Sequence, residues 1–231
     1  MDQYTNVAPA VGMADVDTRA RFIMRTYNHL FGAILAFTGI EIMLFKTGLA
    51  ETIAAAMLGT SWLLVLGAFM VVSWLATRIS LTARSLGAQY AALGGFIIAE
   101  ALIFVPILYI AEQHAGGNVI SSAATVTFIG FAVLTGVAWY TRKDFSFMRG
   151  ILTWGGIIAL VAIVGAVIFK FELGIWFSLA MIALAGAAIL YDTSNILHHY
   201  PEDRYVGAAL SLFASVALMF WYVLRLFMSR R

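Results

Sequence analysis

Long apolar stretches separated by short polar connections make up most of the chain. A helix that crosses a membrane needs about 20 mainly apolar residues. Seven stretches come close to that length, and their approximate bounds are 26–45, 61–79, 86–110, 119–140, 151–169, 173–197 and 205–227. A further apolar stretch at 48–60, GLAETIAAAMLGT, either extends the second span or lies in the membrane interface. The pattern predicts an all-α membrane protein with seven transmembrane helices, in which residues 26–231 form one domain after a polar, cytoplasmic N-terminal tail at 1–25.

The composition agrees with a chain that lies mostly in lipid. Of its 231 residues, 62% are hydrophobic and only 11% are charged, whereas a soluble domain carries about a quarter charged residues. A surface with so few charges must largely face the bilayer. The absence of cysteine excludes disulfides, thiolate metal sites and cysteine nucleophiles, and a net charge of +2 gives no reason to expect nucleic acid as a partner.

Lys and Arg residues in the short connections predict the orientation, because they favour the cytoplasmic side of a membrane. Most of them fall on the side of the N-terminus, namely Arg19, Arg21, Arg25, Arg78, Arg84, Arg142, Lys143, Arg149 and Arg204. The opposite side holds fewer, namely Lys46, Lys170, Arg225, Arg230 and Arg231. We therefore expect a multi-pass protein with a cytoplasmic N-terminus and with its C-terminus on the opposite side.

The residues give little support for the chemistry of known membrane enzymes and pigments. A retinal protein needs a lysine in its last span, and 205–227 contains none. Haem ligation needs histidines inside spans, and only His29 lies within one. The sequence has no Gly-rich phosphate loop and no H-E-x-x-H motif, and no span supplies a serine nucleophile with a partner histidine. The sequence therefore predicts neither an enzyme nor a bound cofactor.

Three acidic residues lie inside the predicted spans, where charged groups are costly and usually mark a pathway or a paired site. Glu41 lies shortly before Lys46 at the end of the first span, and we interpret it as a side chain that snorkels to the interface. Glu100 lies past the middle of the third span, so it should face the bundle interior or line a wet cavity. Asp192 near the end of the sixth span is either a hydrated helix-end carboxylate or part of a site inside the membrane.

Small residues in the last two spans predict that these helices pack closely. Gly207, Ser211 and Ser215 recur every four positions and form one packing face of the last helix. The preceding span contains the similarly small run ALAGAAIL. Close approach of the two helices would bring Asp192 within hydrogen-bonding distance of Ser211 or Ser215.

Two longer motifs carry a resemblance to a known family. YTRKDFSFMRGIL connects the fourth and fifth spans, while AILYDTSNILHH and EDRYVGAALSLF cover the sixth and seventh. In these residues, and over nearly its whole length, the chain resembles the Bax-inhibitor-motif membrane proteins, and it is most similar to their bacterial YccA-like branch. The resemblance implies a protein of the bacterial inner membrane, folded as a seven-helix bundle with the last helix at its centre.

The same resemblance implies roles for particular residues. In the better-known members, an aspartate of the sixth helix and one of the seventh form a proton-responsive gate for a calcium leak, and a basic residue after the second helix latches it. Asp192 matches the first aspartate, Ser215 stands in place of the second, and the latch falls on Arg78 or Arg84. Since a serine cannot ionise, a sharp pH response does not follow, and no firm metal site is expected beyond weak calcium binding at Asp192.

Two functions of different classes follow from these residues and the resemblance. In the first, the chain is an interaction protein that modulates the FtsH-type membrane protease, which would grip the segment 1–19, expected to be disordered and cytoplasmic. In the alternative, it is a pH-sensitive leak channel for calcium or another cation, with Asp192 and Ser215 as the proton-sensing gate and Glu100 in the ion pathway. The expected partners are the lipid bilayer, the protease, and Ca²⁺ or H⁺.

Overall fold

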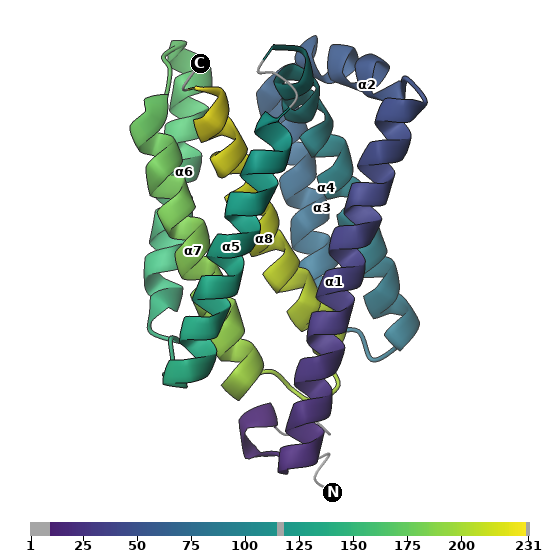
Figure 1. Cartoon of the computed structure of the whole chain (residues 1–231), viewed down its shortest axis with the longest axis vertical. Helices are drawn as coiled ribbons and strands as arrows, with labels where there is room; N and C mark the ends of the chain where they lie inside the picture. The colour runs from purple at the N-terminus through teal and green to yellow at the C-terminus, as the bar shows by residue number, and fades with distance from the viewer. Residues whose placement is uncertain (1–9, 115–117, 230–231) are drawn as a thin grey trace, which may run out of the picture.

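The computed structural model describes residues 10–114 and 118–229, and its regular structure there is helical, apart from one isolated bridge between Ala10 and Pro201 (Figure 1). The helices are η1 (Val11–Met13), α1 (Val16–Lys46), α2 (Leu49–Leu58), α3 (Trp62–Thr82), α4 (Leu86–His114), α5 (Val119–Thr141), α6 (Met148–Phe169), α7 (Gly174–His198) and α8 (Tyr205–Met228). All except η1 and α2 are long and apolar enough to cross a membrane. The prediction of seven transmembrane helices is therefore confirmed.

The first helix begins earlier than predicted. α1 starts at Val16 rather than at position 26, so its first turns are polar and extend beyond the apolar stretch. Asp15 is the N-cap, and one of its carboxylate oxygens accepts the backbone N–H groups of Asp17 and Thr18, each at 3.0 Å. The bond from Thr18 contributes most to holding the pKa of Asp15 below its usual range. Capping, which the apolar pattern does not reveal, explains the additional turns.

The apolar stretch before α3 folds as a separate helix, α2, and does not extend the second span. Gly48, with a φ of 76°, turns the chain sharply between α1 and α2. The ten residues of α2 reach about 15 Å, which is too short to cross a bilayer. Figure 1 shows α2 lying across the upper end of the bundle, where Ala50 and Ala54 are buried against Leu44 and Val105.

α8 lies at the centre of the bundle, which confirms the arrangement that the resemblance implied. It packs against α1, α3, α4, α5 and α7, and Figure 1 shows it passing between them. In its apolar stretch 61% of the residues are buried, close to the 67% of α4 and far above the 6% of α6. Aromatic rings join α8 to α4: Phe213 meets Phe96 edge-on with centroids 6.0 Å apart, and Phe220 stacks on Phe104 at 5.5 Å.

The outer faces of the bundle are apolar. Phe128 of α5 is 67% exposed, and Trp154 and Val161 of α6 are each 66% exposed. Such large side chains on the outside of a bundle with few charges are stable in contact with lipid rather than water. The chain is therefore a multi-pass membrane protein, as its composition predicted.

Candidate functional site

Asp192 and Ser215 join the last two helices at a buried contact. Asp192 lies in the last turns of α7, and Ser215 faces it from α8; each is only 8% exposed. Ser215 Oγ donates a hydrogen bond of 2.5 Å to Asp192 Oδ2, a length at the short end of the range for a hydroxyl bonded to a carboxylate. The predicted hydrogen bond is confirmed, so Asp192 is not a helix-end carboxylate that points into solvent.

Tyr200, in the turn between α7 and α8, lies next to this pair. Its hydroxyl donates to Ser211 Oγ at 3.1 Å, so Ser211 bonds Tyr200 while Ser215 bonds Asp192. Burial, and after it the negative charge of Asp192, raises the pKa of Tyr200. The phenol therefore remains protonated and can keep donating its hydrogen bond.

The start of α8 is held against the end of α3. Gly207 allows a close approach there: a Cβ at this position would lie 2.8 Å from Leu81 Cδ2 and 3.0 Å from the carbonyl oxygen of Ser80. The Arg204 guanidinium donates a hydrogen bond to the carbonyl of Ala83, the C-cap residue that follows α3. The predicted packing face of α8 therefore contacts α3 through its glycine and bonds Asp192 and Tyr200 through its serines.

The residues on which the latch was predicted do not pair with Asp192. Arg78 lies over the ring of Trp74, 5.3 Å from its centroid, and both Arg78 and Arg84 are exposed. Within the part of the chain that the structure describes, neither arginine forms an ion pair with Asp192. The basic side chain that links the C-cap of α3 to the start of α8 is Arg204, for which the sequence predicted no such contact.

Residues 10–14, which we call the N-terminal cover, lie on the turn that contains Tyr200. The N–H of Val11 donates to the carbonyl oxygen of Tyr200 at 2.9 Å, and the side chain of Val11 is fully buried. Gly12 lies so close to His198 that a Cβ would be 2.7 Å from its carbonyl oxygen. The disorder predicted for 1–19 is therefore wrong from Ala10 onward, while residues 1–9 lie outside the described part of the chain.

The two motifs that carry the resemblance contact each other in space. Ser194 of α7 is fully buried, and its hydroxyl oxygen accepts the N–H of Phe145 in the connection between α5 and α6 at 2.9 Å. In the same connection, Asp144 lies 2.9 Å from His199 Nε2. The N–H of Ser146, followed by His199, lowers the pKa of Asp144 to about 2. The sequence shows both motifs, but their contact requires the fold.

The other two acids inside the bundle lie in separate cavities. Glu100 is 6% exposed and lines a cavity of about 1330 Å³ between α3, α4, α6, α7 and α8, as expected of an acid that faces the interior. Asp192 is not among the described residues that line this cavity. Glu41 is 7% exposed, and neither of its carboxylate oxygens has a hydrogen-bond partner among the described residues. The interpretation that Glu41 snorkels to the interface is therefore wrong, because α1 turns this side chain inward.

The structure offers no cluster of acids at Asp192. Within residues 10–114 and 118–229, no group of three or more His, Cys, Asp and Glu residues could hold a metal ion. A calcium ion at Asp192 would need further oxygen ligands. The hydroxyl group of Ser215 lies next to the carboxylate but is already hydrogen-bonded to it. Weak calcium binding at Asp192 remains a prediction.

Comparisons with known proteins agree with the motifs. A family model described as Bax1-I, inhibitor of apoptosis-promoting Bax1, matches residues 19–231. The modulator of FtsH protease YccA from Escherichia coli is 33% identical over 119 residues, which cover 51% of this chain and 54% of that protein. An uncharacterized protein of Pseudomonas aeruginosa is 35% identical over 113 residues, which cover 48% of this chain and 50% of that protein. The chain therefore spans about half the length of these two relatives. An uncharacterized protein of Campylobacter jejuni is 31% identical over 222 residues, which are 90% of each chain.

Proposed function

Because the chain belongs to the Bax inhibitor family, we propose that it is a bacterial inner-membrane protein that binds and modulates an FtsH-type membrane protease. The partner is suggested by the similar YccA protein of Escherichia coli, which is named a modulator of that protease. The observation that favours this proposal over a gated channel is the hydrogen bond between Ser215 and Asp192. The Asp192 carboxylate accepts its hydrogen bond from a serine of α8 and so joins α7 to α8. A gate of the kind described for the family would need a second acid at the position of Ser215.

The N-terminal cover supports a contact through the start of the chain. Residues 1–9 directly precede the cover, and the cover is bonded to Tyr200 through Val11. A protease that gripped these first residues would pull on a segment that is bonded to Tyr200, whose hydroxyl bonds Ser211, one turn from Ser215 on α8. Binding at the N-terminus would in this way be mechanically linked to the contact between α7 and α8.

The proposal is tested with the full chain and a variant that lacks residues 1–9, which leaves the cover and the N-cap of α1 intact. Both are reconstituted with the protease and a membrane substrate, and binding and substrate degradation are measured. We expect the full chain to co-purify with the protease and to slow degradation, and the shortened chain to do neither. Glu51→Gln, which changes an exposed acid of α2, serves as the control. A well-folded full chain that does not bind the protease overturns the proposal.

A cation leak is a second candidate function, favoured by the position of Glu100 on the large cavity. Flux of Ca²⁺ into proteoliposomes separates the two functions. Flux that depends on pH and is lost in Asp192→Asn and Glu100→Gln supports the leak, whereas no flux from folded protein opposes it. Ser215→Asp provides a second acid, and a channel of this geometry should then respond more steeply to pH, because two close carboxylates share a proton.

A further inference from the structure

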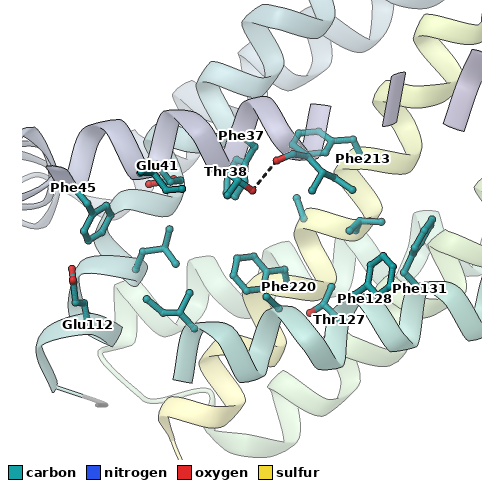
Figure 2. Close-up of a pocket in the computed structure, with 17 residues that line it drawn as sticks. Phe37, Thr38, Glu41, Phe45, Glu112, Thr127, Phe128, Phe131, Phe213 and Phe220 are labelled. Carbon is teal, nitrogen blue, oxygen red and sulfur yellow. Dashed lines mark hydrogen bonds between the residues drawn. The ribbon is translucent and has the colours of Figure 1, made fainter. Parts of the chain in front are cut away.

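A groove opens between α1 and α5 on the outside of the bundle. The backbones of these two helices stay apart, although Tyr27 of α1 meets Trp139 of α5 edge-on. A cavity of about 420 Å³ lies between the helices, over α4 and α8. Its walls are mainly apolar, and the aromatic rings that line it are Phe37, Phe45, Phe128, Phe131, Phe213 and Phe220 (Figure 2). The groove therefore suits an apolar ligand that enters from the surrounding lipid.

Polar groups without partners face the same groove. Glu41 is 7% exposed and Thr127 is 3% exposed, and within the described residues neither the Glu41 carboxylate oxygens nor the Thr127 hydroxyl has a hydrogen-bond partner. Glu112, at the end of α4, also lines the groove. Figure 2 shows Glu41 and Glu112 at the same end of the groove, with Thr127 farther along it. One end is therefore acidic, and the rest is apolar except for threonine side chains such as that of Thr127.

The chemistry of this end determines the kind of ligand. A buried polar group without a hydrogen bond costs about 1–3 kcal/mol, and more if it is charged. Two carboxyl groups attract a cation and accept hydrogen bonds, and no Lys, Arg or His is among the described residues that line the groove. A ligand that combines an apolar body with a positively charged N–H donor, such as a primary ammonium group, would satisfy Glu41 and match the acidic end of the groove.

The volume of the groove and the depth of Glu41 in the membrane limit the kind of ligand further. A transmembrane helix with a radius of about 5 Å and a length of about 30 Å occupies about 2,400 Å³, which is several times the volume of the groove. A cavity of about 420 Å³ is instead within the range that holds a small ligand or a single flexible chain. Glu41 lies about 7.5 Å below the end of α1 at Lys46, so a bound amine would be close to the lipid headgroups.

We propose that the groove between α1 and α5 binds one acyl chain of a phospholipid with a primary amine headgroup, and that the ammonium group donates to Glu41 and is attracted by Glu112. The phenylalanine rings contact the acyl chain along the groove. The Thr127 hydroxyl supplies a donor for a carbonyl oxygen of the same lipid. This inference is independent of the protease and of ion conduction.

The proposal is tested by native mass spectrometry of the full chain, titrated with phosphatidylethanolamine, phosphatidylcholine or phosphatidylglycerol. We expect retention of phosphatidylethanolamine in preference to the other two, since the choline group has no N–H and the glycerol headgroup leaves the lipid anionic. Glu41→Gln should weaken that binding about tenfold or more, as expected for the loss of a hydrogen bond between charged groups. Glu100→Gln removes an equally buried acid from the other cavity and should leave lipid binding unchanged.

Two further variants keep the test decisive if Glu41→Gln folds poorly. Glu112→Gln changes an exposed acid at the same end of the groove and should weaken binding of the amine lipid alone. Ala124→Phe fills the groove from an exposed position on α5 and should reduce binding of every lipid. Equal affinity for the three lipids, a preference for the anionic lipid, or a dimer whose formation excludes lipid would each overturn the proposal.

Discussion

Asp192 and Glu41 are both buried acids of a membrane bundle, yet their surroundings differ. Asp192 is 8% exposed and accepts a hydrogen bond from Ser215, with Tyr200 and the N-terminal cover packed nearby. Glu41 is 7% exposed and has no partner among the described residues. Burial of the two acids is thus almost equal, but only one is satisfied within the protein.

The comparison teaches that burial alone does not identify a functional acid in a membrane. A satisfied acid stabilises the contact between its helices, whereas an unsatisfied one lowers stability until something else provides a donor. Asp192 therefore belongs to the internal architecture at one end of the bundle. Glu41, on a groove that opens toward lipid, is the better candidate for contact with an outside molecule.

The largest expected effect comes from removing the donor to Asp192. Ser215→Ala leaves a buried carboxylate without its hydrogen bond and should lower the free energy of unfolding by about 2 kcal/mol. Thr127→Val is the matched change in the groove, and it should raise the free energy of unfolding by about 1 kcal/mol, because it removes a buried hydroxyl that has no partner to lose among the described residues. Denaturant titration in lipid-free detergent measures both, and equal losses would abolish the distinction between the two regions.

Replacement of the unsatisfied acid should have the opposite sign. In lipid-free detergent, Glu41→Leu should raise the free energy of unfolding by about 1–2 kcal/mol, since it removes a buried polar group without breaking a hydrogen bond. Asp192→Leu should lower it, because Ser215 then loses its acceptor. The same titration, repeated with added phosphatidylethanolamine, should shrink the advantage of Glu41→Leu. A loss of stability in Glu41→Leu would show that the protein itself satisfies Glu41.

A smaller effect is expected from displacing the N-terminal cover. Gly12→Val places a side chain against the carbonyl oxygen of His198, where even a Cβ would be 2.7 Å away. The Val11 N–H should then exchange with solvent about tenfold faster, which corresponds to about 1.4 kcal/mol. Hydrogen exchange of this amide measures the effect. Gly32→Val, at a glycine of α1 with open space around it, should leave the rate unchanged.

The smallest effect concerns the connection between α5 and α6. The pKa of Asp144 is about 2, below its ordinary 3.8, so its carboxylate stabilises the fold above about pH 4 and loses this contribution as the pH falls toward 2. Asp144→Asn should therefore lower the melting temperature slightly at pH 6 and not at pH 2. The effect is small because Asp144 and His199 are both about half exposed. A difference that stays constant over this range would contradict the explanation.

Parts of the site could be predicted from the chain alone. The four-residue spacing of Ser211 and Ser215 placed a hydroxyl face on α8, and the hydrogen bond to Asp192 follows from that face. The bonds of Arg204 to Ala83 and of Ser194 to Phe145 could not be predicted, because each joins segments that are distant in sequence. In both cases a polar side chain bonds a backbone group. Every residue has a backbone, so the sequence contains no complementary side chain that would reveal the partner.

The sequence by itself determined the seven membrane helices, because in lipid every backbone N–H and C=O must be paired within its own segment. That requirement is local, so it can be recognised in each apolar stretch separately. The tertiary structure alone decided which acids are satisfied, since the direction of a side chain on a helix has meaning only relative to its neighbours. For this reason Glu41, near a lysine in the sequence, lies in a groove between two helices whose backbones stay apart.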